Sequence, residues 1–231
     1  MLGLPDGVTA CLFDLDGVLT KTAVVHARAW KQMFDDYLRE RGEERPFNAH
    51  DDYDTYVDGK PRDAGVRDFL ASRGIHVDDA EVKRLGGIKN DLVLELIKRD
   101  GVEAYDGSVR YLHAAREAGL RRAVVSSSHN CRDVLVAAGI EELLEERVDG
   151  MVADELELHG KPAPDTFLEG ARRLGVEASQ AAVFEDALAG VEAGRAGRFG
   201  CVIGVDRVGQ REALKSHGAS VVVDDLAELL K

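Results

Sequence analysis

The stretch CLFDLDGVLTKT, residues 11–22, constrains the fold of this chain more than any other. An apolar run that begins at Val8 and ends at Leu15 carries Asp14 near its end, and Asp16 follows directly. Near-continuous apolar runs are typical of parallel strands buried on both faces, and open α/β sheets bind their ligands at the carboxyl ends of such strands. Two carboxylates at one strand end repel each other unless a cation joins them. The stretch therefore predicts a parallel sheet with a cation-dependent site where its first strand ends.

From Tyr105 onward, strand-like and helix-like segments alternate. The predicted strands contain RRAVVS, VDGMVA, AAVFED, CVIGV and SVVV, and amphipathic segments separate them. Strands that alternate with helices indicate βαβ units. We therefore predict the α/β class, with a doubly wound parallel sheet of Rossmann-like type.

Residues 21–104 follow a different pattern. Apolar residues recur there at spacings of three and four, as on one face of a helix: Ala23, Ala27, Trp30, Phe34 and Leu38. Polar turns such as RGEERPFN and SRGIHVDD follow, without a convincing strand. We predict that residues 21–104 form an all-helical cap, inserted into a core of residues 1–20 and 105–231. A cap attached beside the two aspartates is placed to act as a lid.

The charge of the chain limits its partners. A formal net charge of −13 argues against a nucleic-acid or anionic-membrane partner, because both require a basic face. The three cysteines show no C-x-x-C spacing, which fits a reducing compartment. The segment MLGLPDG has no basic leader, and the sequence contains no apolar run long enough to span a membrane. We expect a cytoplasmic protein, and a monomer.

Polar residues follow four of the predicted strands or their loops. They are Asp14 with Asp16, then Ser126, then Lys161, then Glu185 with Asp186. The ends of parallel strands meet at one edge of a sheet, so these side chains are expected in one crevice. At about 4 Å, each like-charged pair costs roughly 4 kcal/mol at an effective dielectric near 20, which one lysine cannot offset. An all-oxygen site of this kind suits Mg²⁺.

Each piece alone has a simpler interpretation. A D-x-D pair can be a loop or a cap, and KPAPD can begin a helix. SSSHN can be a run of capping residues, and EDALAG can place acids in the first turn of a helix. The joint order of the four pieces, each near a strand end, favours the site.

The motifs DLDGVLT, VVSSS, GKPAPD and FEDALAG resemble, in this order, the four motifs of the haloacid dehalogenase superfamily. The resemblance covers essentially the whole chain, with the cap between the first and second motifs. It implies that Asp14 attacks phosphorus to form an aspartyl phosphate, and that Asp16 is the general acid and base. Dehalogenating members do not need the second aspartate, so Asp16 favours phosphoryl transfer.

The same resemblance implies roles for the other motif residues. Ser126 would hydrogen-bond the transferring phosphoryl group, and Lys161 would neutralise its oxygens. One Mg²⁺ ion would be held by Asp14, the backbone carbonyl of Asp16, and Asp186. Glu185 would bind the same ion or support its ligands.

The cap resembles that of the β-phosphoglucomutase subfamily. DLDGVLTKTAVVHARAWKQ matches its hinge and first cap helix, DGKPRDAG its phosphate-binding loop, and KND its cap lysine segment. By this resemblance the substrate-binding residues are Thr22, His26, Trp30, Gly59, Arg62, Lys89, Ser127, Ser128, His129 and Asn130. The chain departs from the subfamily at His129, where a lysine is usual, and in the longer, more acidic loop HDDYDTYVDGK.

The cap residues also have simpler interpretations. Trp30 can be a core residue and His26 a surface histidine, while Arg62 and Lys89 can be solvated charges. Taken together they fit a mutase, which must hold a second phosphate one sugar ring away from the first. An arginine and a lysine can do this.

We therefore predict Mg²⁺-dependent phosphoryl transfer on a small phosphorylated sugar. The leading interpretation interconverts β-glucose 1-phosphate and glucose 6-phosphate, with glucose 1,6-bisphosphate as intermediate or activator. The first alternative is a sugar-phosphate phosphatase on the same residues. The second alternative is a catalytically silent binding or regulatory module.

Overall fold

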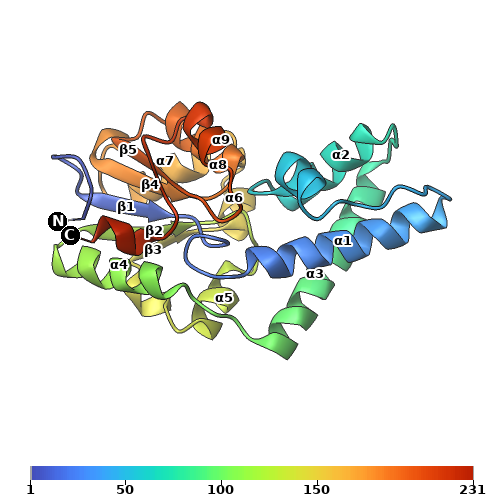
Figure 1. Cartoon of the computed structure of the whole chain (residues 1–231), viewed down its shortest axis with the longest axis horizontal. Helices are drawn as coiled ribbons and strands as arrows, with labels where there is room; N and C mark the ends of the chain where they lie inside the picture. Colours follow the sequence, from blue (N-terminus) through green and yellow to red (C-terminus); the bar gives the residue numbers. More distant parts are fainter. Residues whose placement is uncertain (1, 231) are drawn as a thin grey trace.

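A computed structural model describes residues 2–230 and contains a six-stranded parallel sheet (Figure 1). The strands run in the order β3-β2-β1-β4-β5-β6. Their bounds are β1 (Ala10–Phe13), β2 (Arg121–Val125), β3 (Glu146–Val148), β4 (Ala181–Glu185), β5 (Cys201–Val205) and β6 (Val221–Val223). The central strand β1 pairs with β2 and β4, so that Phe13 stands opposite both Val124 and Phe184. The carboxyl ends of these three strands are therefore level, and the predicted doubly wound α/β class is confirmed.

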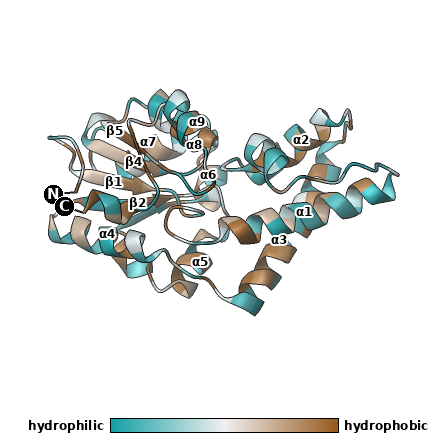
Figure 2. Ribbon diagram, in the orientation of Figure 1, coloured by the Kyte–Doolittle hydropathy of each residue, from teal (hydrophilic) through white to brown (hydrophobic). Residues whose placement is uncertain are grey.

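Helices cover both faces of the sheet. Those of the sheet region are α4 (Asp106–Glu117), α5 (Cys131–Ala137), α6 (Gly150–Glu155), α7 (Asp165–Arg173), α8 (Leu188–Ala196) and α9 (Arg211–His217), with short 3₁₀ turns η2 (Glu141–Leu143), η3 (Ala178–Gln180) and η4 (Leu226–Leu229). Phe13 packs in a core with α4 and α5, and its neighbour Leu12 packs in a second core with α7, α8 and α9. Because both faces are buried, β1 is apolar at every position, as the hydropathy colours show (Figure 2).

Residues 21–104 form helices to one side of the sheet (Figure 1). These are α1 (Ala23–Glu40), the π-helical turn η1 (Tyr53–Val57), α2 (Arg62–Ser72) and α3 (Asp79–Asp100). They bury a core of their own, built around Trp30, Phe34 and Phe69. An isolated β-bridge between Thr20 and Ala104 joins the two ends of this segment. The segment is helical as expected, while its action as one moving cap stays a prediction.

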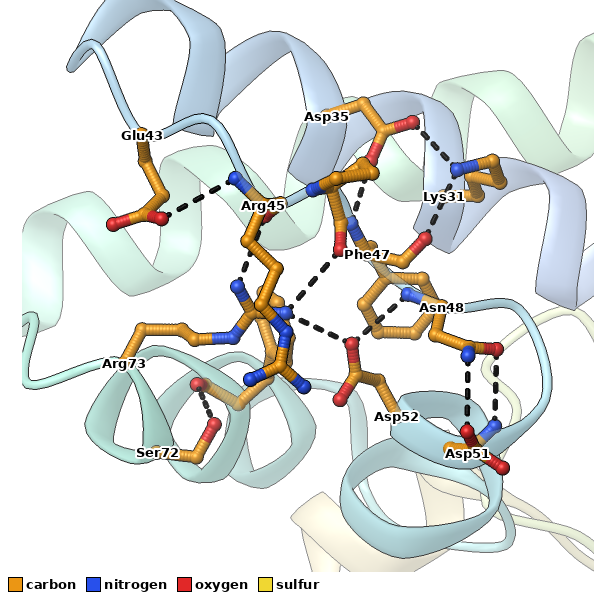
Figure 3. Close-up of polar contacts among 12 residues, drawn as sticks. Lys31, Asp35, Glu43, Arg45, Phe47, Asn48, Asp51, Asp52, Ser72 and Arg73 are labelled. Atoms are coloured by element: carbon orange, nitrogen blue, oxygen red, sulfur yellow. Dashed lines mark hydrogen bonds and ion pairs between the residues drawn. The ribbon is translucent and has the colours of Figure 1, made fainter.

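A polar network fastens the irregular segment between α1 and η1 (Figure 3). Arg73, which directly follows α2, donates to the carbonyl of Arg45 at 2.9 Å and to Asp52 at 2.9 Å. Asp35 of α1 accepts a hydrogen bond from the amide of Phe47 at 2.8 Å. The Arg73 and Asp52 side chains are each only 7% exposed. These bonds fix where η1 begins, and η1 leads directly into the pocket described below.

One expected strand was placed wrongly. The segment VDGMVA was predicted as a strand, but β3 ends at Val148 and the helix α6 starts at Gly150. The cause is Asp149, whose side chain accepts a hydrogen bond from the amide of Val152 and caps the helix. Lys161 therefore follows a strand and a short helix.

The structure also bears on the cysteines and on membrane contact. Cys11, Cys131 and Cys201 are buried and free, so they act as small apolar side chains. Within residues 2–230, every helix is too short or too polar to cross a membrane.

Candidate active site

A pocket lies between the carboxyl ends of the central strands and the helical segment. From the sheet side come Asp14 and Asp16 after β1 and Asp186 after β4, while α1, α3 and the loop after η1 supply the facing wall. Its lining comprises Asp14, Asp16, His26, Trp30, Tyr53, Val57, Asp58, Gly59, Lys60, Arg62, Lys89, Asn90, Val93, Ser127, Ser128, His129, Asn130, Asp186 and Ala187.

Most predicted site residues belong to this lining, and four lie just beneath it. The four are buried: Thr22, Ser126, Lys161 and Glu185. The fold thus brings together all the residues that sequence reasoning selected, and the role of each remains a prediction.

Lys161 lies between two buried carboxylates. Its Nζ is 2.5 Å from Asp14 Oδ1 and 2.7 Å from Glu185 Oε1, and it also donates to the carbonyl of Val125 at 3.1 Å. Burial lowers the pKa of Lys161, but the two carboxylates outweigh burial and raise it above the usual lysine value. The ammonium is therefore charged, and it occupies one oxygen of Asp14.

Asp14, Glu185 and Asp186 form a buried acidic cluster. One carboxylate oxygen from each lies within 4.8 Å of the others. Burial raises the pKa of all three, that of Glu185 to about 7 and that of Asp186 well above its usual range. A single ammonium cannot balance three carboxylates at this spacing.

The backbone around this cluster leaves room for the carboxylates. Gly17 has φ +89°, and a Cβ there would lie 1.7 Å from Asp186 Oδ2. A Cβ at Gly190 would lie 1.8 Å from Glu185 Oε1. The amide of Ala187 donates to the other oxygen of Glu185 at 2.9 Å. Three carboxylates held in this way offer only oxygen ligands, and they fit one hard divalent cation such as Mg²⁺.

Asp16 lies at the end of a chain of polar contacts from the helical segment. Thr22 donates a hydrogen bond to Asp16 Oδ1, and His26 Nε2 is 3.4 Å from the same oxygen. On the other side of the ring, Lys89 Nζ is 2.7 Å from His26 Nδ1. Burial raises the pKa of Asp16, which favours a protonated carboxyl able to donate a proton.

Burial also lowers the pKa of two basic side chains of the helical segment, Lys89 and His26. It lowers the pKa of Lys89 to about 7, and together with the Lys89 charge it lowers the pKa of His26 well below its usual value. A neutral His26 with its proton on Nε2 accepts from Lys89 and presents an N–H to Asp16. Lys89 also lies 4.9 Å from the centre of the Trp30 ring. Trp30 is therefore both a core residue and a wall of the pocket.

Arg62 is the second cap cation at the pocket. It is the first residue of α2, and its Nε is buried and lacks a hydrogen-bond partner among residues 2–230. The Asp63 carboxylate, 3.9 Å from Nε, is too far for a hydrogen bond. A buried guanidinium donor without a hydrogen-bond partner favours an anionic ligand, because an unsatisfied polar group is costly.

The loop after β2 connects the sheet region to the helical segment. Ser127 Oγ donates to the carbonyl of Gly59 at 3.0 Å, and Asn130 Nδ2 donates to Asn90 Oδ1 at 2.9 Å. Ser126 Oγ accepts from the amide of Ser128 at 3.1 Å. His129 pairs with Asp154 at 2.8 Å. The helical segment is thus closed over the pocket.

Sequence reasoning missed four polar residues of the pocket: Tyr53, Asp58, Lys60 and Asn90. Burial, followed by the charge of Glu185, raises the pKa of Asp58 to about 8. Asp58 directly precedes Gly59 and Asn90 directly follows Lys89, so their neighbours in the chain were a usable signal. The extra carboxylate fits the acidic character noted for the loop at residues 50–60.

Known proteins resemble this chain along its whole length. A family model for hydrolases, described as haloacid dehalogenase-like hydrolase, matches residues 8–198. A β-phosphoglucomutase of Mycobacterium bovis is 53% identical over 100% of this chain and 94% of its own length. Hexitol phosphatase A of Escherichia coli is 31% identical over 80% of this chain and 77% of its own length.

A solved structure extends the likeness to three dimensions. The crystal structure of a β-phosphoglucomutase from Clostridium difficile superimposes with a TM-score of 0.80 and 25% identity. The match covers 96% of this chain and 93% of that one.

Proposed function

Since the chain belongs to the haloacid dehalogenase-like hydrolase family and is an enzyme, we propose that it is a β-phosphoglucomutase. In this proposal it interconverts β-glucose 1-phosphate and glucose 6-phosphate. The proposal includes the cytoplasmic location and the monomeric state expected from the sequence.

One observation carries the proposal. A single pocket combines the Asp14–Asp16 pair of the sheet with basic side chains of the helical segment, among them Lys89 and Arg62. A mutase substrate is charged at both ends during the reaction, so it needs one set of groups for the reacting phosphate and another for the distal one. The full-length similarity to proteins named β-phosphoglucomutase supports the same assignment.

Asp14 and Asp16 carry the proposed chemistry. The oxygen of Asp14 that Lys161 does not hold attacks phosphorus, and the bond from phosphorus to the sugar oxygen breaks as Asp16 protonates that oxygen. The raised pKa of Asp16 suits this acid role. In the reverse direction Asp16 removes a proton from a sugar hydroxyl, which then takes the phosphoryl group from Asp14.

A mutase cycle joins these two directions. β-Glucose 1-phosphate accepts the phosphoryl group from Asp14 at its 6-hydroxyl and becomes glucose 1,6-bisphosphate. This intermediate reverses its orientation in the pocket, so that its 1-phosphate faces Asp14. Asp14 accepts that phosphoryl group, and glucose 6-phosphate is released. Asp14 carries no phosphoryl group while the bisphosphate reorients. Closure of the helical segment must therefore exclude water in the two transfer steps, when an aspartyl phosphate and a sugar are both in the pocket.

The remaining residues bind the substrate and neutralise the charge of its phosphates. Asp14, the Asp16 carbonyl and Asp186, with support from Glu185, would hold Mg²⁺, which would supply positive charge for the phosphoryl oxygens. Lys161 and Ser126 act beside this site. Arg62, Lys89 and the segment Ser127–Asn130 hold the distal phosphate, while Thr22, His26, Trp30 and Gly59 position Asp16 and the sugar.

A sugar-phosphate phosphatase is the second candidate. It is favoured by the similarity to hexitol phosphatase A and needs only water in place of the sugar hydroxyl. A catalytically silent module is set aside, because the family is one of enzymes.

One incubation separates the two candidates. The protein is mixed with β-glucose 1-phosphate, Mg²⁺ and a trace of glucose 1,6-bisphosphate, and glucose 6-phosphate and free phosphate are measured together. A mutase forms glucose 6-phosphate with little phosphate, and Asp14→Asn abolishes this. Rapid release of phosphate would overturn the mutase in favour of the phosphatase.

A further inference from the structure

Arg207, in the loop after β5, contacts both connections between the sheet and the helical segment. Its Nε donates to the carbonyl of Gly17 at 2.7 Å, and its guanidinium carbon lies 3.6 Å from the centre of the Tyr105 ring. Its Nη1 donates to the carbonyl of Asp224 at 2.8 Å. The side chain is only 16% exposed. One guanidinium thus joins three segments that are distant in the sequence.

The two connections run side by side where Arg207 meets them. Thr20 forms a bridge with Ala104, and the amide of Tyr105 donates to the carbonyl of Leu19 at 3.0 Å. Arg207 touches both on the sheet side of this bridge. The orange-to-red segment after β5 approaches the blue loop after β1 in Figure 1. Arg207 can therefore keep its contacts while the helices beyond the bridge move.

The loop that carries Arg207 is itself held firmly. The carboxylate of Asp206 accepts from the amides of Gly209 at 2.7 Å and Gln210 at 2.8 Å. Gln210 Nε2 in turn donates to the backbone carbonyl of Asp186 at 3.0 Å. The same loop thus holds the backbone just after Asp16, through Arg207, and the backbone of the metal-cluster residue Asp186, through Gln210.

We propose that Arg207 is a positioning residue that keeps the segment Asp14–Gly17 in register with Asp186 while the helical segment opens and closes. It touches no substrate and acts through the Gly17 carbonyl. Gly17 directly follows Asp16, so a turn of its peptide would displace the acid–base carboxyl. Misplacement of reacting groups by about 1 Å can cost on the order of 100-fold in rate. The kinetic part of this inference rests on the proposed function.

Three variants separate positioning from stability. Arg207→Met keeps an aliphatic stem against Tyr105 and removes the donors to Gly17 and Asp224. Arg207→Lys keeps the charge, but a lysine head cannot make both directed bonds in this geometry. Arg211→Met is the matched control, because Arg211 donates to the carbonyl of Val222 and to the Asp224 carboxylate on the same side of the molecule. Neither of these contacts is with Gly17 or Tyr105.

The experiment combines kinetics, thermal melting and amide hydrogen exchange on the full chain with Mg²⁺. For Arg207→Met we expect kcat to fall about 10- to 100-fold with KM for β-glucose 1-phosphate changed less than about 3-fold. Amides of residues 17–20 should exchange faster, and Arg207→Lys should recover part of both effects. Arg211→Met should also lower the Tm, while it leaves kcat and this exchange unchanged.

Two results would overturn the proposal: unchanged exchange at residues 17–20 in Arg207→Met, or equal loss of kcat in Arg211→Met. Failure of the proposed function shows separately, as a wild-type protein that does not convert β-glucose 1-phosphate. The same three variants are then compared by hydrolysis of p-nitrophenyl phosphate and by exchange, with the same expected differences.

Discussion

Lys89 Nζ lies 2.7 Å from His26 Nδ1, so a cap lysine fixes the tautomer of the histidine that faces Asp16. An ammonium donates to Nδ1, which leaves the proton on Nε2, 3.4 Å from Asp16 Oδ1. His26 and Lys89 both belong to the helical segment, so this chain of contacts connects that segment to Asp16. In the proposed function, where Asp16 is the general acid and base, the relationship would couple closure to proton transfer.

Replacing His26 tests this coupling. His26→Ala removes the N–H toward Asp16 and leaves Lys89 without its partner, so we expect kcat to fall about 10- to 100-fold. His113→Ala, at an exposed position of α4, is the control and should match the wild type. Steady-state kinetics decide, and a His26→Ala enzyme with wild-type kcat contradicts the coupling.

The acidic cluster predicts a pH dependence of stability in the Mg²⁺-free protein. Burial raises the pKa of Glu185 to about 7 from the ordinary glutamate value, so folding favours its protonated form. Stability is then unaffected below about pH 4.5 and falls as the pH rises to about 7, by at most about 3 kcal/mol. Thermal melts between pH 5 and 8 measure this. Saturating Mg²⁺ should largely remove the slope, and an equal slope with and without Mg²⁺ would show that the ion does not bind the cluster.

The sequence could predict the sheet because its strands are buried on both faces. Strands β1 and β5 could be predicted because each is an apolar run that ends in charged residues. After β1 these residues are Asp14 and Asp16. The misplaced strand at VDGMVA depended on one capping bond of Asp149, which the apolar pattern does not reveal. Local periodicity therefore located the elements better than their boundaries.

The site was predictable to the extent that its residues follow strand ends. Lys161 and Glu185 are 24 residues apart in the numbering yet meet at 2.7 Å, and the order of parallel strands accounts for this. Asp58 and Arg207 were not predicted, because each reaches its partners from a loop with a side-chain orientation that no periodicity encodes. Arg207 meets Gly17 across 190 positions of sequence.

Gly17→Ala should damage the acidic cluster that is proposed to hold Mg²⁺. Gly17 has φ +89°, and the added Cβ would lie 1.7 Å from Asp186 Oδ2, so Asp186 must move. We expect Mg²⁺ affinity, measured by calorimetry, to fall at least about 10-fold, in the range seen when ligand support is lost. Gly42→Ala is the matched control, because Gly42 also has a positive φ of +72° but faces open space. It should lose about 1 kcal/mol of stability and keep its Mg²⁺ affinity.

The buried Asp52–Arg73 pair should contribute to the stability of the helical segment. Asp52→Ala leaves Arg73 charged and buried, so we expect a loss of about 3 kcal/mol in the free energy of unfolding. Urea unfolding measures it, and Asp52→Ala/Arg73→Met should recover part of the loss. Arg67→Ala, which breaks the exposed Arg67–Asp79 pair, is the control and should cost less than about 1 kcal/mol. If Asp52→Ala lost no more unfolding free energy than the Arg67→Ala control, the network of Figure 3 would not hold the segment.

Arg62→Ala distinguishes binding of a distal phosphate from binding of the reacting one. Arg62 lines the pocket from the start of α2, and its buried Nε has no hydrogen-bond partner within residues 2–230. In the proposed function the reacting phosphate lies elsewhere, beside Asp14 and Lys161. Because the guanidinium would contact only a substrate with a second phosphate, the variant should lose about 100-fold or more in kcat/KM for conversion of β-glucose 1-phosphate. Hydrolysis of p-nitrophenyl phosphate, which has no distal phosphate, should change less than about 3-fold. Arg67→Ala, in the same helix α2 but outside the pocket lining, where Arg67 pairs with Asp79 at 2.6 Å, controls for loss of positive charge and should spare both reactions. Equal losses with both substrates for Arg62→Ala would mean that Arg62 supports the closed fold instead of gripping a second phosphate, and the phosphatase would then become the better assignment.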